Sequence, residues 1–72
     1  MIGTPSRYYE VTYSNSRDKW IVSEIDGNQQ YGVKIFDTKN ESVKYARKLA
    51  KKYYSALVVK NKDGSLSEKS EY

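Results

Sequence analysis

One stretch of the sequence, residues 38–54 (TKNESVKYARKLAKKYY), has the pattern of an amphipathic helix. Thr38 is followed three residues later by Glu41, the spacing of a capping box, in which each side chain satisfies a backbone N–H at the start of the helix. Apolar residues then recur at intervals of three and four, which at about 100° per residue places them on one stripe. The residues of this stripe are Val43, Ala46, Leu49, Ala50 and Tyr53. The pattern predicts a helix whose apolar side packs on the core.

The opposite side of this predicted helix is cationic. Its members are Lys44, Arg47, Lys48, Lys51 and Lys52, and no acidic residue lies between positions 44 and 52. The rest of the chain has eight basic and nine acidic residues, so the formal net charge of +4 belongs to this one helix face.

The flanking segments predict strands. Residues 7–14, 19–25 and 31–36 are rich in β-branched and aromatic residues, and turn signals separate them. After the helix, residues 56–59 form a short apolar run that is typical of a covered strand, and residues 65–72 form either a short edge strand or a frayed end. The order is β-β-β-α-β(-β), an α+β domain with a three-stranded meander, a C-terminal strand or hairpin and one helix packed on one sheet face. A right-handed crossover would place residues 56–59 parallel to the first strand and beside it.

We expect one domain over residues 7–72, preceded by a flexible lead-in at residues 1–6. The sheet residues best placed to meet the helix are Val11, Trp20, Val22, Phe36, Leu57 and Val59. The other face of the second and third strands is expected to carry Ile21, Ile25, Tyr31, Val33 and Ile35. One helix cannot cover both faces, so the second face is covered either by the C-terminal tail or by a second copy in a homodimer.

Composition excludes much chemistry. The chain has no cysteine and no histidine, its four glycines are isolated, and its carboxylates are scattered over strands and turns. We therefore predict a non-enzymatic domain with no catalytic residue, no metal site, no cofactor and no small-molecule substrate. No signal peptide or apolar membrane span is recognisable, so we expect a soluble cytoplasmic protein without a membrane partner.

The order of several short motifs over residues 7–72 resembles a family of small bacterial and phage proteins, the domain-of-unknown-function family twenty-one eighty-eight. The motifs are Trp20-x-Val22, Phe36-Asp37-Thr38-Lys39, the helix segment at residues 45–52, Leu57-Val58-Val59, Asp63-Gly64 and Glu68-x-x-x-Tyr72. The resemblance implies no particular activity. Members typically have a glycine between the helix and the next strand, whereas Tyr53, Tyr54 and Ser55 stand here, so we expect a looser turn or strain at Ser55.

Residues 7–54 are more loosely similar to the arm-type DNA-binding domains of phage integrases, in which the sheet contacts DNA.

Two functions remain open. Cations of a single sign suit the phosphates of DNA or RNA, and tyrosines on the strands can stack on unpaired bases, so we predict nucleic-acid association through Lys44, Arg47, Lys48, Lys51 and Lys52. A solvated helix face is the simplest competing interpretation, since the helix dipole favours basic residues near a C-terminus, but such faces usually mix signs. The alternative function is a protein-interaction module, a phage-related or host-encoded adaptor or inhibitor. It would act through the apolar sheet face, as a homodimer, or through the cationic helix on an acidic protein partner.

Overall fold

The computed structural model describes residues 7–72 as five strands and one helix. Residues 1–6, the predicted lead-in, lie outside the described part. The elements are β1 (Arg7–Ser14), β2 (Lys19–Asp26), β3 (Gln29–Phe36), α1 (Lys39–Lys52), β4 (Ala56–Lys60) and β5 (Leu66–Glu71). Each predicted element is present, and residues 66–71 form a strand instead of fraying.

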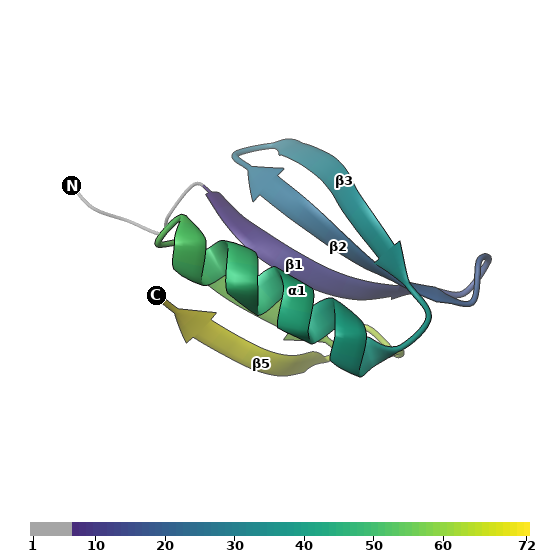
Figure 1. The fold of residues 1–72 in the computed structure, drawn as a ribbon. Helices are drawn as coiled ribbons and strands as arrows, with labels where there is room; N and C mark the ends of the chain where they lie inside the picture. Colours follow the sequence, from purple (N-terminus) through teal and green to yellow (C-terminus); the bar gives the residue numbers. More distant parts are fainter. Residues whose placement is uncertain (1–6) are drawn as a thin grey trace.

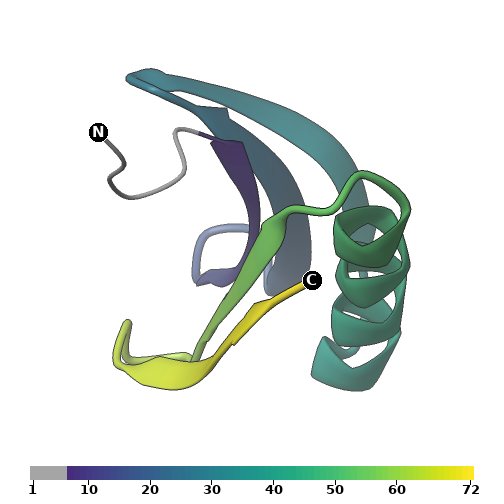
Figure 2. The ribbon, with the colours of Figure 1, turned by 90° about the vertical axis from the view of Figure 1, so that its left-hand side faces the viewer.

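All five strands belong to one sheet in the order β3-β2-β1-β4-β5 (Figure 1). β1 and β4 pair in parallel, and the other neighbours pair antiparallel. The predicted placement of β4 beside β1 is therefore confirmed, and β4 is an inner strand. Figure 2 shows α1 on one side of the sheet only.

The start of α1 is fixed by the predicted cap. The backbone N–H of Glu41 donates to Oγ1 of Thr38 at 3.2 Å, and the same hydroxyl donates to the carboxylate of Glu41 at 3.0 Å. The reciprocal bond therefore runs between the two side chains, whereas in a full capping box the Glu41 carboxylate would accept from the backbone N–H of Thr38.

The core lies between α1 and the sheet. The predicted sheet residues Val11, Trp20, Val22, Leu57 and Val59 are buried, and Phe36 packs half-buried against them. From the helix stripe Ala46 and Ala50 are buried, and Val43 and Leu49 are half-buried.

Two positions on α1 differ from the expectation. Tyr53 was predicted to face the core but is 51% exposed, because it is the C-cap and lies at the end of the layer, against the ring of Tyr9. Ser42, which is not apolar, is fully buried, and its hydroxyl donates to the carbonyl of Lys39 at 2.7 Å. This hydrogen bond removes the cost of burying the hydroxyl.

The C-terminus of α1 closes tightly. The backbone N–H of Ser55 donates to the carbonyl of Ala50 at 2.8 Å, and that of Tyr54 donates to Lys51 at 3.5 Å. These are the two bonds of a Schellman motif, which requires a left-handed residue after the cap. That residue is Tyr54, with φ of 52°. The expectation of a looser turn or of strain at Ser55 was therefore wrong, because the strain lies at Tyr54.

The sheet face opposite α1 has no cover among the described residues. β5 continues the sheet beside β4, so the predicted cover by the C-terminal tail was wrong. Ile35 and Val33 are 46% and 39% exposed. β3 contains a bulge at Val33, which lies between the pairs Val22↔Lys34 and Ser23↔Gly32 and has no partner on β2. Because of this bulge, Tyr31 pairs with Glu24 and lies on the helix side of the sheet, contrary to the prediction.

Candidate nucleic-acid interface

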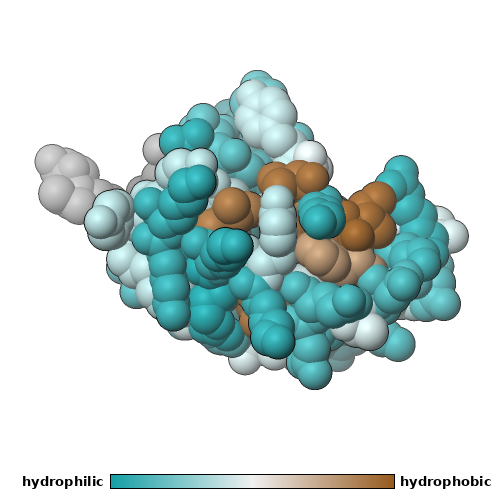
Figure 3. All heavy atoms as spheres, in the orientation of Figure 1, coloured by the Kyte–Doolittle hydropathy of each residue, from teal (hydrophilic) through white to brown (hydrophobic). Residues whose placement is uncertain are grey.

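The exposed side of α1 carries four lysines, which we call the lysine row: Lys44, Lys48, Lys51 and Lys52. All four are exposed. Lys44, Lys48 and Lys52 are spaced four residues apart and therefore follow one side of the helix. Figure 3 shows many hydrophilic side chains on this side of the molecule, with hydrophobic patches between them. Within residues 7–72 no carboxylate forms a salt bridge with any of the four.

A shallow groove runs along the lysine row. It is lined by Lys44, Arg47, Lys48 and Lys51. An anion in this groove would meet several ammonium groups at once, above the aliphatic stems of the same side chains.

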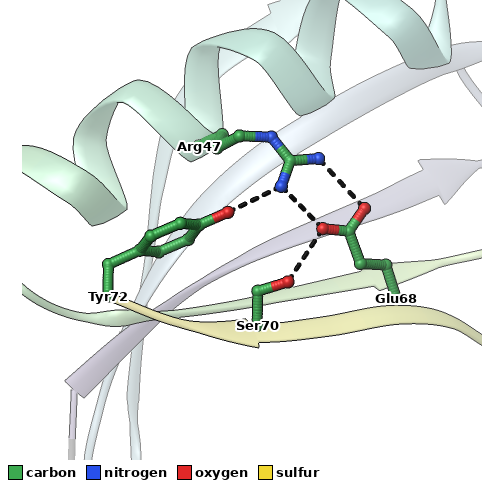
Figure 4. Close-up of polar contacts among 4 residues, drawn as sticks. All are labelled: Arg47, Glu68, Ser70 and Tyr72. Carbon is green, nitrogen blue, oxygen red and sulfur yellow. Dashed lines mark hydrogen bonds and ion pairs between the residues drawn. The ribbon is translucent and has the colours of Figure 1, made fainter.

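Arg47 has a different environment from the four lysines (Figure 4). Its guanidinium donates from Nη1 to Oε2 of Glu68 at 2.7 Å and from Nη2 to Oε1 at 3.0 Å, a two-point ion pair. Nη1 also donates to the hydroxyl of Tyr72 at 2.6 Å, and Ser70 donates to Glu68 at 2.9 Å. We call these four residues the β5 clamp, because they tie α1 to the last strand.

The charges within the β5 clamp stabilise each other. Hydrogen bonds from Arg47 and then Ser70 lower the pKa of Glu68 below its ordinary value. The acceptors Glu68 and Tyr72 raise the pKa of Arg47 further above its already high value. Arg47 therefore stays charged, but its charge is compensated within the fold.

The sequence pattern therefore identified the four lysines as an exposed cationic face, but it missed the partner of Arg47. The partner comes from a strand 21 residues away in sequence. One signal for it exists, because Glu68, Ser70 and Tyr72 alternate with period two and so lie on one face of β5.

The other ion pairs lie away from the outer side of α1. They join Arg7 to Glu24, Lys19 to Asp37 and Lys60 to Glu10. These contacts compensate charge on the sheet and its loops, and the positive charge of the lysine row remains.

Aromatic rings flank part of the lysine row. The ammonium of Lys52 lies 5.4 Å from the ring centroid of Tyr53, and that of Lys51 lies 5.6 Å from the ring of Tyr72. Tyr54, which follows Tyr53 in the chain, is 85% exposed. The C-terminal end of α1 thus combines positive charge with accessible aromatic surface.

The open sheet face has a different chemistry. A shallow hollow there is lined in part by Ile21, Ser23, Gln30, Val33 and Ile35. Ile35 and Val33 are exposed here, and Ile21 is half-buried. Of the two charged residues in the lining, only Arg17 brings its charge to this face, because the ammonium of Lys34 lies 5.2 Å from the ring centroid of Tyr45 on α1. This surface suits an apolar contact better than an anion.

Two further features bear on function. Within residues 7–72 no group of three or more histidine, cysteine, aspartate or glutamate residues could hold a metal ion. In the same part of the chain, α1 is too short and too polar to cross a membrane.

Comparisons with known proteins place the chain in a family without an assigned activity. No curated protein and no solved structure matches it significantly. Residues 9–72, nearly the whole chain, match a family described as uncharacterized and conserved in bacteria. The family predicted from the sequence is thus confirmed, and the protein belongs to the DUF2188 family.

Proposed function

We propose that this domain associates with nucleic acid through the lysine row of α1. The observation that carries the proposal is the exposure of four lysines along one helix side with no acidic partner in residues 7–72. From Lys44 to Lys52 the helix rises about 12 Å, the axial length over which one strand of duplex DNA places three or four phosphates.

In this proposal Arg47 mainly holds the helix surface in place, and the lysines contact the nucleic acid. Its guanidinium forms one wall of the groove, but both of its terminal nitrogens donate to Glu68. Phosphates would therefore meet the lysines first. Replacing Arg47 would also break the β5 clamp, so a binding test must leave it in place.

The test is the triple variant Lys44→Glu, Lys48→Glu and Lys52→Glu, measured by fluorescence anisotropy with labelled DNA and RNA at several salt concentrations. If four phosphates are contacted, the affinity of the parent for duplex DNA should fall with a log–log salt slope of about −3 to −4. The variant should lose most binding at low salt, because repulsion replaces attraction.

A matched control separates this surface from net charge. The variant Arg17→Glu, Lys62→Glu and Lys69→Glu changes the net charge by the same amount at exposed positions outside α1. It should keep most of the affinity. Equal losses in the two variants, or no binding by the parent at low salt, would overturn the proposal.

The open sheet face supports a second candidate, a homodimer. The supporting observation is the exposure of Ile35 and Val33 beside half-buried Ile21, with no cover in the described part of the chain. An apolar patch on a two-fold axis meets the same patch on its partner, which satisfies the self-complementarity that such dimers need. Molar mass from light scattering over a range of concentrations tests it, and a monomer at every concentration would remove this candidate.

A further inference from the structure

Tyr54 is the one residue of the helix end whose identity the fold does not explain. Its φ of 52° lies in the left-handed region, which disfavours side chains with a Cβ and is usually filled by glycine. Its side chain is 85% exposed, and its hydroxyl makes no hydrogen bond with the described residues. The backbone therefore bears a cost for a ring that contributes little to packing.

Tyr54 stands at the end of α1 where the lysine row ends. Tyr54 comes two residues after Lys52, and the intervening Tyr53 is 51% exposed, with the ammonium of Lys52 5.4 Å from the centroid of its ring. We call Tyr53 and Tyr54 the tyrosine pair. A nucleic-acid strand whose phosphates follow the lysine row would reach the tyrosine pair at the end of α1.

We propose that the tyrosine pair stacks on unpaired bases, which makes single-stranded nucleic acid the preferred ligand of this surface. This inference rests on the proposed function and adds the ligand class to it. In a duplex the base faces are already stacked on one another, whereas in a single strand they are accessible to aromatic side chains. Stacking depends little on sequence, because every base has an aromatic face.

The central variant is Tyr54→Gly, which removes the ring and relaxes the left-handed backbone. It should bind a labelled oligothymidine strand at least about fivefold more weakly, the lower end of the usual effect of losing one stacked base. Its affinity for a duplex of the same length should be unchanged. Tyr54→Phe keeps the ring and should bind like the parent. Leu66→Ala removes another exposed apolar side chain, 60% accessible and outside α1, and should also have no effect.

The stability of Tyr54→Gly shows whether weaker binding comes from partial unfolding or from loss of the ring. Because glycine suits the left-handed position, the unfolding midpoint of Tyr54→Gly should match or exceed that of the parent. Weaker single-strand binding by an equally stable protein would therefore support a direct contact of the ring.

The outcomes separate this inference from the proposed function. If the parent binds single strands and duplex equally, and Tyr54→Gly binds both like the parent, the inference is overturned while a loss in the lysine variant still supports the proposed function. If the parent binds neither ligand, both are overturned. An acidic peptide tests whether the surface binds any polyanion. If the peptide displaces the DNA and binds Tyr54→Gly as tightly as the parent, and Tyr54→Gly also keeps its affinity for single strands, stacking is overturned.

Discussion

The two faces of the sheet both carry large apolar side chains, but α1 covers only one of these faces. On neighbouring strands, Trp20 pairs with Phe36 on the face below α1, and Ile21 pairs with Ile35 on the opposite face. Trp20 is 6% exposed, whereas Ile35 is 46% exposed. The hydrophobic contribution to folding therefore comes mainly from one face, and the apolar residues of the other are available for contacts that folding does not require.

The largest expected effect is on the covered face, in the variant Trp20→Ala. The indole packs against the ring of Tyr13 at a centroid distance of 5.1 Å and belongs to the buried core. Truncation should lower the free energy of unfolding by about 3–5 kcal/mol. A domain of this size has about 4–11 kcal/mol in total, so the variant should be near its limit of stability in urea unfolding. A loss below about 1 kcal/mol would show that the core lies elsewhere.

The β5 clamp extends the covered face to the edge of the sheet, and the variant Glu68→Gln tests it. The side chains of Arg47 and Glu68 are 34% and 33% exposed, so solvent screening limits the expected loss to about 1 kcal/mol near neutral pH.

The pH dependence gives a sharper test of the β5 clamp. The pKa of Glu68 is lowered in the folded state, so its contribution is present above the unfolded pKa of about 4.3 and is lost as the pH falls through the folded pKa. The parent should therefore lose stability more steeply than Glu68→Gln in acid below about pH 5. Urea unfolding at several pH values measures this, and parallel curves for the two proteins would contradict a charged clamp. Ser14→Ala, which removes a hydroxyl contact with Ser16 and involves no carboxylate, is the control.

A substitution on the open sheet face should lower the free energy of unfolding only slightly. If this face is an interface, the loss should depend on protein concentration. In dilute protein, Ile35→Ala should cost about 0.5 kcal/mol, since nearly half of the side chain is already in water. If a second copy covers this face, the cost should rise with protein concentration, because association stabilises only the folded parent. Urea unfolding at low and high concentration distinguishes the two cases. A concentration-independent cost would leave the homodimer without support.

The sequence predicted those parts of the fold that depend on local patterns. The Thr38–Glu41 cap and the helix and strand periodicities located all six elements, because each acts within a few residues. The side on which Tyr31 lies was not predictable, because a bulge depends on the register with β2 and not on the sequence of β3 alone.

The candidate site shows the same limit. The lysines of α1 were recognisable from their spacing, whereas the pairing of Arg47 with Glu68 depends on the tertiary position of β5. The left-handed residue was also missed, because the usual signal is glycine and a tyrosine occupies the position. Long-range pairing and unusual backbone geometry thus account for most of what the pattern left out.

The smallest expected effect, and the only one of opposite sign, is at the exposed end of α1. Tyr54→Gly removes the cost of a left-handed residue with a side chain, but glycine also gives the unfolded chain more freedom. The two effects nearly cancel, so the free energy of unfolding should rise by a few tenths of a kcal/mol. Tyr54→Ala, which keeps the Cβ without the ring, should not gain this stability, and thermal unfolding of the two variants separates backbone from side chain. If both lost stability equally, the ring would be part of the packed structure after all, and the contrast between covered and available surfaces would not extend to the end of α1.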